Sequence, residues 1–274
     1  MKKVLVTGSE GYIGQHLCKM LREDPTIDLY CIDQFMDKMP QKHAVDIRVK
    51  DHVKYRIKSG NDFDTVIHLA ALVQVGESVK YPSAYYITNV KGTMNVLKHI
   101  KYDNFIFAST GAASQPDSPY GFSKRMAEDV VKEWARNYTI FRFYNVIGSD
   151  GFEPTNPDGL FYKLKKAPKK GKFCIYGEDY NTKDGTCVRE YVHVNDICKA
   201  IIKAIHKPSN KIENLAYGDT RTVKEIVEIF KKVNNVDFDV IYKDARPGDL
   251  EACYLEHPSE YMERNYSYEE MLKI

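Results

Sequence analysis

The stretch VLVTGSEGYIG, residues 4–14, decides the fold of this 274-residue chain. Its first residues predict a short buried strand, and Gly8, Gly11 and Gly14 follow directly before a helix expected over 12–23. Glycines at this spacing allow a tight turn and a close approach of the backbone, so the amides that begin the helix can bind a pyrophosphate. The stretch therefore predicts the strand, turn and helix that open a dinucleotide-binding sheet.

Short apolar strands alternate with helices along the first half of the chain. This alternation predicts an α/β fold, a Rossmann-type doubly wound parallel sheet. The further strands are expected at 28–32, 65–70, 103–109 and 139–143, and the longer helices at 82–100 and 120–137.

The pattern becomes irregular and rich in Gly, Pro, Asp and Asn from about residue 144. We therefore expect a dinucleotide-binding domain over 1–143 and a smaller α/β substrate-binding region over 144–274. The chain is expected to cross back to the sheet near 188–206. Ligands of such sheets bind at the carboxyl ends of the strands, so this second region should lie over that edge.

The composition is that of an ordinary soluble protein, with 43% hydrophobic and 28% charged residues and a net charge of +2. That charge gives no reason to expect nucleic acid or a membrane as partner. The six cysteines are scattered without a C-x2-C pair, which argues against a metal site and fits free thiols in a reducing compartment. The apolar run after MKK ends too early for a signal peptide, so we expect a cytoplasmic protein.

Asp33 ends the second expected strand, 19 residues after Gly14. A carboxylate at that place accepts a hydrogen bond from the 2′-hydroxyl of a ribose and repels a 2′-phosphate. The position therefore favours NAD over NADP. A helix cap or a turn residue is the alternative interpretation of Asp33.

Tyr120 and Lys124 lie four residues apart in SPYGFSK (118–124), which places them one turn apart on one helix face. A free tyrosine has a pKa of about 10, and a nearby ammonium favours its phenolate form. We therefore expect Lys124, helped by a positively charged nicotinamide ring, to lower the pKa of Tyr120. The resulting base can take a proton from a sugar or alcohol hydroxyl. The spacing alone is common in surface helices, but here it follows a dinucleotide motif.

Further segments extend the pattern, and together they resemble the UDP-glucose (UDP-galactose) 4-epimerases of the extended short-chain dehydrogenase/reductase superfamily. The resemblance covers nearly the whole chain. The 175–196 segment is the most specific part of this resemblance, because it belongs to the substrate-binding half of the chain and not to the shared NAD-binding fold. The segments read TVIHLAA (65–71), VGESVKYPSAYYITNVKGT (75–93), NFIFAST (104–110), IYGEDYNTKDGTCVREYVHVND (175–196) and RPGDLEACY (246–254).

The resemblance implies NAD as cofactor and a UDP-sugar as substrate. It also implies 4-epimerisation through a transient 4-keto sugar, and a homodimer formed through the helices at 82–100 and 120–137. The implied catalytic residues are Thr110, Tyr120 and Lys124. The implied NAD-binding residues are Gly8, Gly11, Tyr12, Ile13, Gly14, Asp33, Asp46, Ile47, Leu69, Ala70, Ala71, Asn89, Tyr120, Lys124 and Tyr144. The implied substrate-binding residues are Thr110, Tyr120, Asn145, Tyr176, Arg189, Arg246, Asp249 and Cys253.

The chain is a shortened member by this comparison, because only residues 111–119 separate Thr110 from Tyr120. The resemblance places Cys253 at a gate beside the C2 substituent of the sugar. A small residue there leaves room for an N-acetyl group, so UDP-GlcNAc and UDP-GalNAc are expected as additional substrates. The alternative is that Cys253 is simply a small buried thiol.

Other functions stay open. Sugar-nucleotide dehydratases place acids after the catalytic serine or threonine, whereas Gly111 and Ala112 follow Thr110, which disfavours dehydration. A UDP-glucuronate 4-epimerase and a catalytically silent NAD-binding protein are the remaining alternatives.

Several residues also have structural interpretations. His68 and His193 are expected in the core, and Arg189 could form a surface ion pair. The run KLKKAPKKGK (163–172) holds six lysines. A solvated face explains it more simply than nucleic-acid binding.

Overall fold

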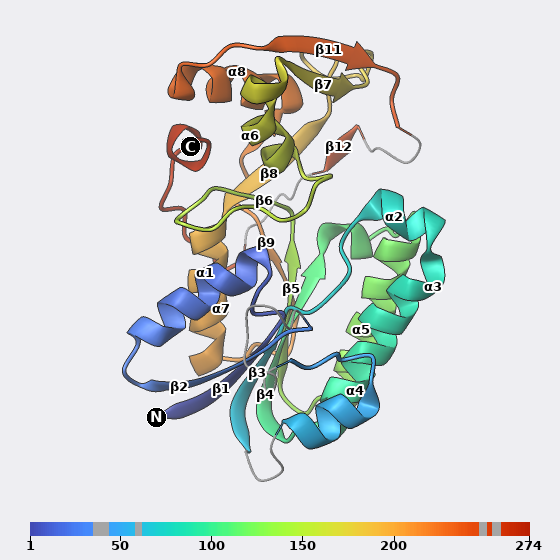
Figure 1. Cartoon of the computed structure of the whole chain (residues 1–274), viewed down its shortest axis with the longest axis vertical. Helices are drawn as coiled ribbons and strands as arrows, with labels where there is room; N and C mark the ends of the chain where they lie inside the picture. Colours follow the sequence, from blue (N-terminus) through green and yellow to red (C-terminus); the bar gives the residue numbers. More distant parts are fainter. Residues whose placement is uncertain (35–43, 58–61, 247–250, 254–258) are drawn as a thin grey trace. The chain divides into compact units, whose positions relative to one another are not determined.

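The computed structural model describes residues 1–34, 44–57, 62–246, 251–253 and 259–274 (Figure 1). Contacts within the chain divide it into two compact units. Unit 1 comprises residues 1–143 and 198–213, and unit 2 comprises residues 144–197 and 214–274. Asp249, one of the expected substrate ligands, lies outside the described residues.

Unit 1 is built on a six-stranded sheet with the strand order β2-β1-β3-β4-β5-β9. The pairs from β2 through β5 are parallel. Parallel strands of this kind are buried on both faces, and their apolar sequences reflect that. The strands are β1 (Lys2–Thr7), β2 (Ile27–Ile32), β3 (Phe63–His68), β4 (Tyr102–Thr110), β5 (Tyr138–Phe143) and β9 (Ile212–Leu215).

Helices cover both faces of this sheet (Figure 1). One face carries α1 (Tyr12–Glu23) and the unit 1 part of α7 (Val194–His206). The other face carries α4 (Gly92–His99) and α5 (Pro119–Trp134), whose apolar sides pack with Val66, Phe105 and Phe107 in a buried core. The α/β, Rossmann-type doubly wound sheet expected from the sequence is therefore confirmed.

The helix expected over 82–100 is continuous but not uniform. It consists of α3 (Pro82–Tyr85), a π-helical segment at Tyr86–Lys91 and α4. Such segments occur often at functional sites, because the extra residue in the turn redirects side chains. Here the π-helical segment carries the buried Asn89. Periodicity in the sequence did not indicate this segment, nor α2 (Val75–Lys80) or the π-helical turn at His52–Arg56.

Unit 2 has its own hydrophobic core, to which two small sheets contribute. β8 (Val188–His193) pairs with β10 (Thr220–Thr222), β12 (Ala252–Cys253) and β6 (Asn145–Ile147). β7 (Lys172–Tyr176) pairs in parallel with β11 (Asp239–Lys243). Apolar side chains of these elements pack with α6 (Leu160–Lys170), α8 (Val223–Asn234) and α9 (Tyr268–Met271).

Two helix starts in unit 2 are fixed by reciprocal caps. Thr222 and Glu225 form a capping box at α8, and Ser267 and Glu270 form another at α9. Each box satisfies two backbone amides that would otherwise lack partners. Among the described residues, no helix combines the length and the apolar composition needed to cross a membrane.

Candidate active site

The glycine turn after β1 has the close packing that the motif predicts. Gly8 has a φ of +74°, and a side-chain carbon there would lie 2.7 Å from the backbone nitrogen of Ala70. A side-chain carbon on Gly14 would lie 2.2 Å from the carbonyl oxygen of Gly8. Only glycine fits both places, so the first turn of α1, with Tyr12 and Ile13, is held close to the end of β1.

Asp33 follows β2 at the same edge of the sheet and is 7% exposed. Its carboxylate accepts a hydrogen bond from the backbone nitrogen of Glu10 at 3.0 Å. The backbone nitrogen of Gly8 in turn donates to the carbonyl of Ile32 at 2.9 Å. These bonds fix the carboxylate beside the glycine turn.

Asp46 and Ile47 lie farther along unit 1. Arg48 donates from Nη2 to the Asp46 carboxylate at 2.7 Å, and this bond lowers the pKa of Asp46. Ile47 is buried, and Gly92 allows its close approach, since a side-chain carbon on Gly92 would lie 2.7 Å from Ile47 Cδ1. Asp46 therefore already has a strong partner within the chain.

Asn89 holds the segment after β3 in place. Its side-chain oxygen accepts from the backbone nitrogen of Leu72 at 2.9 Å, and its side-chain nitrogen donates to the Leu72 carbonyl at 3.0 Å. The same nitrogen donates to Ser123 Oγ at 2.9 Å, and Ser123 donates to the carbonyl of Tyr120 at 2.8 Å. This chain of bonds links the segment of Leu69, Ala70 and Ala71 to the helix that carries Tyr120.

His68 forms a second chain of bonds in the core, where its side chain is 1% exposed. Its Nδ1 lies 2.7 Å from Thr7 Oγ1 and its Nε2 lies 3.0 Å from Thr93 Oγ1. The Thr93 hydroxyl donates to the carbonyl of Asn89 at 2.6 Å, so it accepts a proton from Nε2. Burial and the charge of Lys124 lower the pKa of His68 to about 3, so the ring is neutral. His68 thus has a structural place between β3 and the segment 86–91.

Thr110 and Tyr120 meet where α5 begins. Thr110 ends β4, and its hydroxyl accepts from the backbone nitrogen of Ala112 at 3.3 Å. A side-chain carbon on Gly121 would lie 2.9 Å from the carbonyl of Ala112, so this glycine lets the helix approach the turn. The side chain of Thr110 acts to lower the pKa of Tyr120. The phenol, 9% exposed, also packs edge-on against the ring of Tyr85.

Lys124 lies one turn further along α5 and is 3% exposed. Its ammonium lies over the ring of Phe107, 4.4 Å from the centroid. Burial lowers the pKa of Lys124 to about 7, and the charge of Glu128 acts in the opposite direction.

The lowered pKa expected of Tyr120 included the charge of a nicotinamide ring, and the chain's residues alone act in the opposite direction. Burial raises the pKa to about 12, and the side chain of Thr110 offsets only part of this shift. The physical reason is that both groups are buried, so Lys124 itself resists being charged. The chain's own residues therefore do not produce the lowered pKa expected of the Tyr–Lys pair.

Glu128 was not found by reading the sequence. Its carboxylate is fully buried, accepts from Ser109 Oγ at 2.5 Å, and forms a two-pronged pair with Arg142 at 2.8 and 2.6 Å. Glu128 follows Lys124 by four residues, so both side chains lie on the same face of α5. The sequence did contain a signal for Glu128: an acidic residue four positions after the Y-x3-K motif falls on the buried face of the same helix.

The expected residues of unit 2 that the structure describes lie on or beside the strands of its two sheets. Tyr176 ends β7, and the guanidinium of Arg246 lies 4.8 Å from its ring centroid. Arg189 and Cys253 are paired in register between β8 and β12. Asn145 begins β6 and donates to the carbonyl of Glu190 at 2.9 Å, and Tyr144 donates to Asn214 Oδ1 at 3.4 Å.

Arg189 is held by backbone groups. Its Nη1 donates to the carbonyls of Val188 at 2.8 Å and Glu251 at 3.4 Å. Within the described part of the chain, no carboxylate pairs with this guanidinium. The ion pair considered as the alternative for Arg189 is therefore not seen among those residues.

The model of the NAD dependent epimerase/dehydratase family matches residues 4–218. The chain belongs to this family. The family is described as NAD dependent, and several curated relatives that match this chain over most of its length are named as UDP-sugar 4-epimerases.

Two curated relatives illustrate the range of this family. UDP-glucose 4-epimerase of Haemophilus influenzae is 30% identical, over 92% of this chain and 88% of that protein. A putative UDP-arabinose 4-epimerase of Arabidopsis thaliana is 32% identical, over 92% of this chain and 69% of that protein.

A solved structure of the family has the same fold. UDP-glucose 4-epimerase from Bifidobacterium longum, in complex with NAD+ and UDP, superposes with a TM-score of 0.88 at 26% identity. The match covers 98% of this chain and 96% of that chain.

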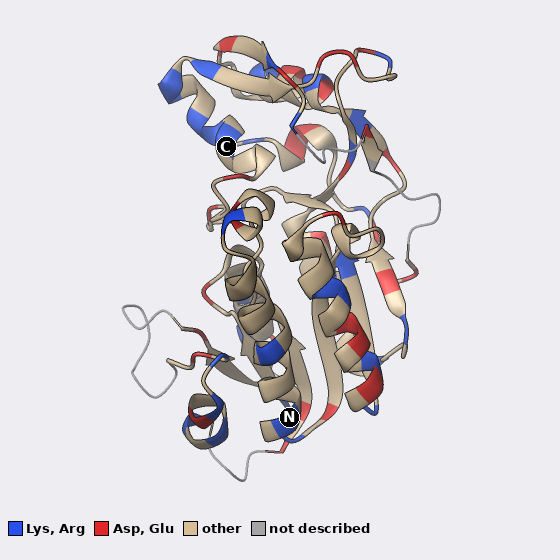
Figure 2. Ribbon diagram, turned by 90° about the vertical axis from the view of Figure 1, so that its right-hand side faces the viewer, with Lys and Arg blue, Asp and Glu red and all other residues tan. Residues whose placement is uncertain are grey.

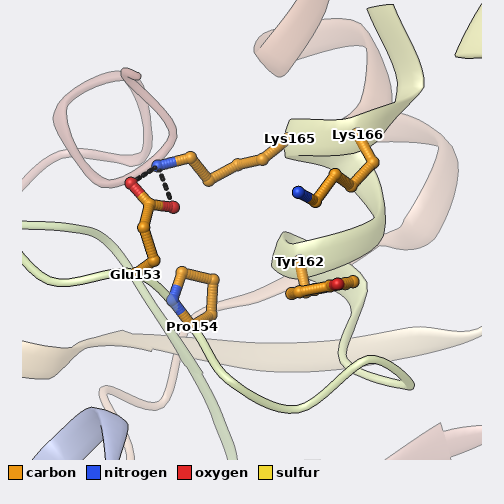
Figure 3. A pocket seen from close by; sticks show the side chains of 5 residues that line it. All are labelled: Glu153, Pro154, Tyr162, Lys165 and Lys166. Carbon is orange, nitrogen blue, oxygen red and sulfur yellow. Dashed lines mark hydrogen bonds and ion pairs between the residues drawn. The ribbon is translucent and has the colours of Figure 1, made fainter. Parts of the chain in front are cut away.

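The lysine run of 163–172 borders a hollow of about 200 Å³ in unit 2 of this family member (Figure 3). Lys165 pairs with Glu153 at 2.7 Å, and the ammonium of Lys166 lies 5.4 Å from the ring centroid of Tyr162. Pro154 completes the lining, which includes none of the expected site residues. These two lysines thus have partners within the chain.

Proposed function

We propose that this chain interconverts the 4-epimers of a UDP-hexose, UDP-glucose and UDP-galactose first, with NAD as its resident cofactor. The observation that carries the proposal is the place of Thr110 at the end of β4, next to the start of α5, which carries buried Tyr120 and buried Lys124 one turn apart. A hydroxyl, a phenol and an amine brought together at the end of β4 suit the movement of a proton on a sugar hydroxyl.

The residues around the glycine turn fit NAD. Backbone atoms of Ala70 and Gly8 lie where side-chain carbons on Gly8 and Gly14 would be, so these glycines keep the turn between β1 and α1 tight. The backbone amides that begin α1 can then approach a pyrophosphate. The buried Asp33 supplies an acceptor for a ribose hydroxyl and disfavours a 2′-phosphate. We therefore assign these three residues, with Tyr12, Ile13 and the segment 69–71, to NAD binding.

When bound, NAD supplies the acceptor and later the donor of the hydride exchanged with C4 of the sugar. Tyr120 Oη takes the proton of the 4-hydroxyl, and Thr110 Oγ1 binds the same sugar oxygen. Lys124 binds the nicotinamide ribose and favours the phenolate of Tyr120. After the 4-keto sugar has turned within the site, Tyr120 returns the proton. Burial raises the pKa of Tyr120 to about 12, and the positive charge of oxidised NAD, when bound, would favour the phenolate.

Arg189 and Arg246 are our candidates for binding the diphosphate of UDP, since guanidinium groups form paired hydrogen bonds with phosphate oxygens. Tyr176 would pack on the uracil ring, and Asn145, Asp249 and Cys253 would complete the substrate site. Tyr144 is assigned to the nicotinamide side, and Asp46, Ile47 and Asn89 to the adenine side and to the loop beneath it.

A UDP-arabinose 4-epimerase is the second candidate, because a putative enzyme of that name is 32% identical to this chain. A 4-epimerase acting on UDP-glucuronate is a third. Pentose and hexose substrates differ at C5, so the same proton and hydride steps at C4 serve them all.

The proposal is tested with purified protein and a panel of UDP-glucose, UDP-galactose, their N-acetyl forms, UDP-arabinose, UDP-xylose and UDP-glucuronate. No NAD is added, bound NAD is quantified, and products are identified by NMR. We expect interconversion of a 4-epimer pair, fastest for UDP-glucose and UDP-galactose. No conversion of any sugar by folded, NAD-loaded protein would refute the proposal, and faster conversion of the pentose pair would favour the second candidate.

Tyr120→Phe should lower kcat by about 10²–10⁴-fold while bound NAD stays unchanged. Tyr102→Phe, at the opposite end of β4, is the matched control and should keep full activity. Equal activity of both variants would contradict the assignment of Tyr120. If neither parent nor variants act on any sugar while all bind NAD, the chain is an NAD-binding protein without this activity.

Cys253 is proposed as the residue that leaves room for an N-acetyl group at C2. Cys253→Tyr should lower kcat/KM for UDP-GlcNAc relative to UDP-glucose by about tenfold or more. An unchanged ratio would show that Cys253 does not limit the C2 substituent.

We also propose a homodimer formed through the helical stretch 82–99 and α5. Ile87, Phe122 and Met126 of these helices are each between 45% and 49% exposed, and Phe122 and Met126 share one face. Figure 2 faces this side of unit 1, and Lys91 and Lys98 are the only Lys, Arg, Asp or Glu residues in 82–99. An exposed apolar face of this kind is typical of an interface.

Analytical ultracentrifugation tests the dimer. Met126→Glu should produce monomers, whereas Ile241→Glu, at an exposed apolar position of unit 2, should not. A monomeric parent protein, or a Met126→Glu variant that remains dimeric, would contradict the proposed interface.

A further inference from the structure

Cys18 and Cys31 form a close pair of thiols in unit 1. Their sulfur atoms are 3.5 Å apart. Cys18 lies on the buried side of α1. Cys31 is paired with Val6 in the parallel register of β2 and β1, and it lies on the face of β2 that α1 covers. The adjacent Tyr30 points to the opposite face, where it packs edge-on against Phe63.

The two thiols have different environments. Cys31 is partly exposed, whereas Cys18 is 1% exposed. Arg22, one turn after Cys18 on the same helix face, places Nη2 3.8 Å from the Cys31 sulfur. The hydrogen bond from Cys18 and the guanidinium lower the pKa of Cys31, while burial and the charge of Glu10 oppose this. The pKa of Cys18 is raised by its bond to Cys31 and by burial.

This asymmetry is what a reversible thiol site needs. The thiolate is the attacking form of cysteine, and a nearby cation stabilises it. Cys31 can therefore react first with a reagent from solution. Cys18, shielded but in contact with the Cys31 sulfur, can then resolve the adduct.

We propose that Cys18 and Cys31 are a dithiol–disulfide modification site that reacts with low-molecular-weight disulfides such as oxidised glutathione. The Cys31 thiolate attacks one sulfur of the small disulfide, forms a mixed disulfide and releases one thiolate. The Cys18 thiolate, after losing its proton to solvent, then attacks the Cys31 sulfur and releases the second thiolate. The protein pair loses two electrons and two protons, and one small disulfide becomes two small thiols.

The position of the pair connects it with the proposed cofactor site. α1 begins at the glycine turn, and β2 ends immediately before Asp33. A bond between Cys18 and Cys31 would link the two elements that carry the proposed NAD ligands. A native disulfide requires sulfur atoms about 2.05 Å apart, so closure needs a movement of about 1.5 Å or a rotation of both side chains.

The test uses the full chain in buffers of defined ratios of reduced to oxidised glutathione. Free thiols are trapped with an alkylating reagent, and peptides are identified by mass spectrometry. We expect a Cys18–Cys31 disulfide that forms and disappears with the ratio. Its formation is measured by mass and not by turnover, so the result is independent of the proposed epimerase activity.

Variants separate the attacking role of Cys31 from the resolving role of Cys18. Cys18→Ala should accumulate the glutathione adduct on Cys31, because the resolving thiol is absent. Cys31→Ala should leave Cys18 unmodified. Arg22→Gln should slow the first step about two- to tenfold. Cys174→Ala, a partly exposed thiol elsewhere, is the control and should leave the disulfide yield unchanged.

Three results would overturn the proposal. The first is a parent protein whose Cys18 and Cys31 both stay reduced under oxidised glutathione while the same chain forms disulfides when unfolded in urea. The second is an adduct that appears first on Cys18. The third is a cross-link that joins Cys18 to Cys198, a buried thiol that also influences the pKa of Cys18.

Discussion

Unit 1 and unit 2 hold their expected ligand-binding residues in different ways. In unit 1, several expected residues are buried, and side-chain bonds join Asn89 through Ser123 to Tyr120. In unit 2, Arg189 is held only by backbone carbonyls among the described residues, and Asn145 likewise donates to a carbonyl. Substitutions in unit 1 should therefore affect stability and cofactor binding together, whereas those in unit 2 should affect substrate affinity with little cost in stability.

The largest effect is expected from Gly14→Ala. The new side-chain carbon would lie 2.2 Å from the carbonyl oxygen of Gly8, and a backbone atom cannot move away cheaply. We expect a loss of more than about 4 kcal/mol of unfolding free energy, or no folded protein, and loss of bound NAD.

Gly76→Ala is the control, because nothing lies within 4 Å of the new carbon. It should raise stability by up to about 1 kcal/mol. Urea unfolding and bound NAD are measured, and equal behaviour of the two variants would contradict the packing described for the turn.

Glu128→Gln should have the next largest effect. The substitution removes the charge of Glu128 from its pair with the guanidinium of Arg142, which is 11% exposed. Breaking such a buried pair costs about 3–5 kcal/mol. In unit 2, Asp237→Asn breaks the pair with Lys231, but that carboxylate is 93% exposed, so the cost should be far smaller than for Glu128→Gln. Urea unfolding measures both, and a loss below 1 kcal/mol for Glu128→Gln would show that the buried pair is not structural.

These two predictions also show what the sequence could supply. The glycine turn, Asp33 and the Tyr–Lys spacing were found because each is a local pattern whose chemistry follows from neighbours in the chain. Glu128 was missed because its partner Arg142 lies on β5, and only the sheet brings the two together. Burial raises the pKa of Tyr120 in the chain alone, and the sequence could not indicate this because burial depends on the packing of residues such as Tyr85.

The thiol pair and the short strands of unit 2 were not predicted for a similar reason: neither produces a local pattern in the sequence. Cys18 and Cys31 are scattered in sequence and meet only because α1 packs on β2. The strands β6, β10 and β12 are two or three residues long, too short to show a periodic pattern. The fold of unit 1 could therefore be predicted closely, whereas the contacts that set charge and reactivity could not.

Lys124→Met should stabilise the protein while abolishing activity. Burial lowers the pKa of Lys124 to about 7, against about 10.4 in the unfolded chain. Between these values the unfolded chain binds more protons, so the stability of the parent rises with pH. Below pH 7 the full cost of the buried charge, roughly 4 kcal/mol, applies, and it disappears toward pH 10. The gain from Lys124→Met should therefore be larger at pH 6 than at pH 9 in urea unfolding.

Lys132→Met is the control for that measurement, since Lys132 lies on the same helix but is exposed and paired with Asp129. Its effect should be small and nearly independent of pH. A Lys124→Met gain that does not change with pH would show that the stabilisation comes from packing and not from the buried charge.

The smallest effect on stability is expected from Arg189→Ala in unit 2. We expect its affinity for UDP to fall about 10- to 100-fold, because a charged hydrogen-bonding group would be lost from the proposed diphosphate site. Arg221→Ala is a matched control, since Arg221 is paired in register with Arg189 across β8 and β10. Arg221 already pairs with Asp219 at 2.6 Å, so its removal should change UDP affinity less than about threefold. Calorimetric titration with UDP compares the two. Equal losses would mean that the general positive charge of the sheet binds the nucleotide, and an unaffected Arg189→Ala would remove Arg189 from the proposed site.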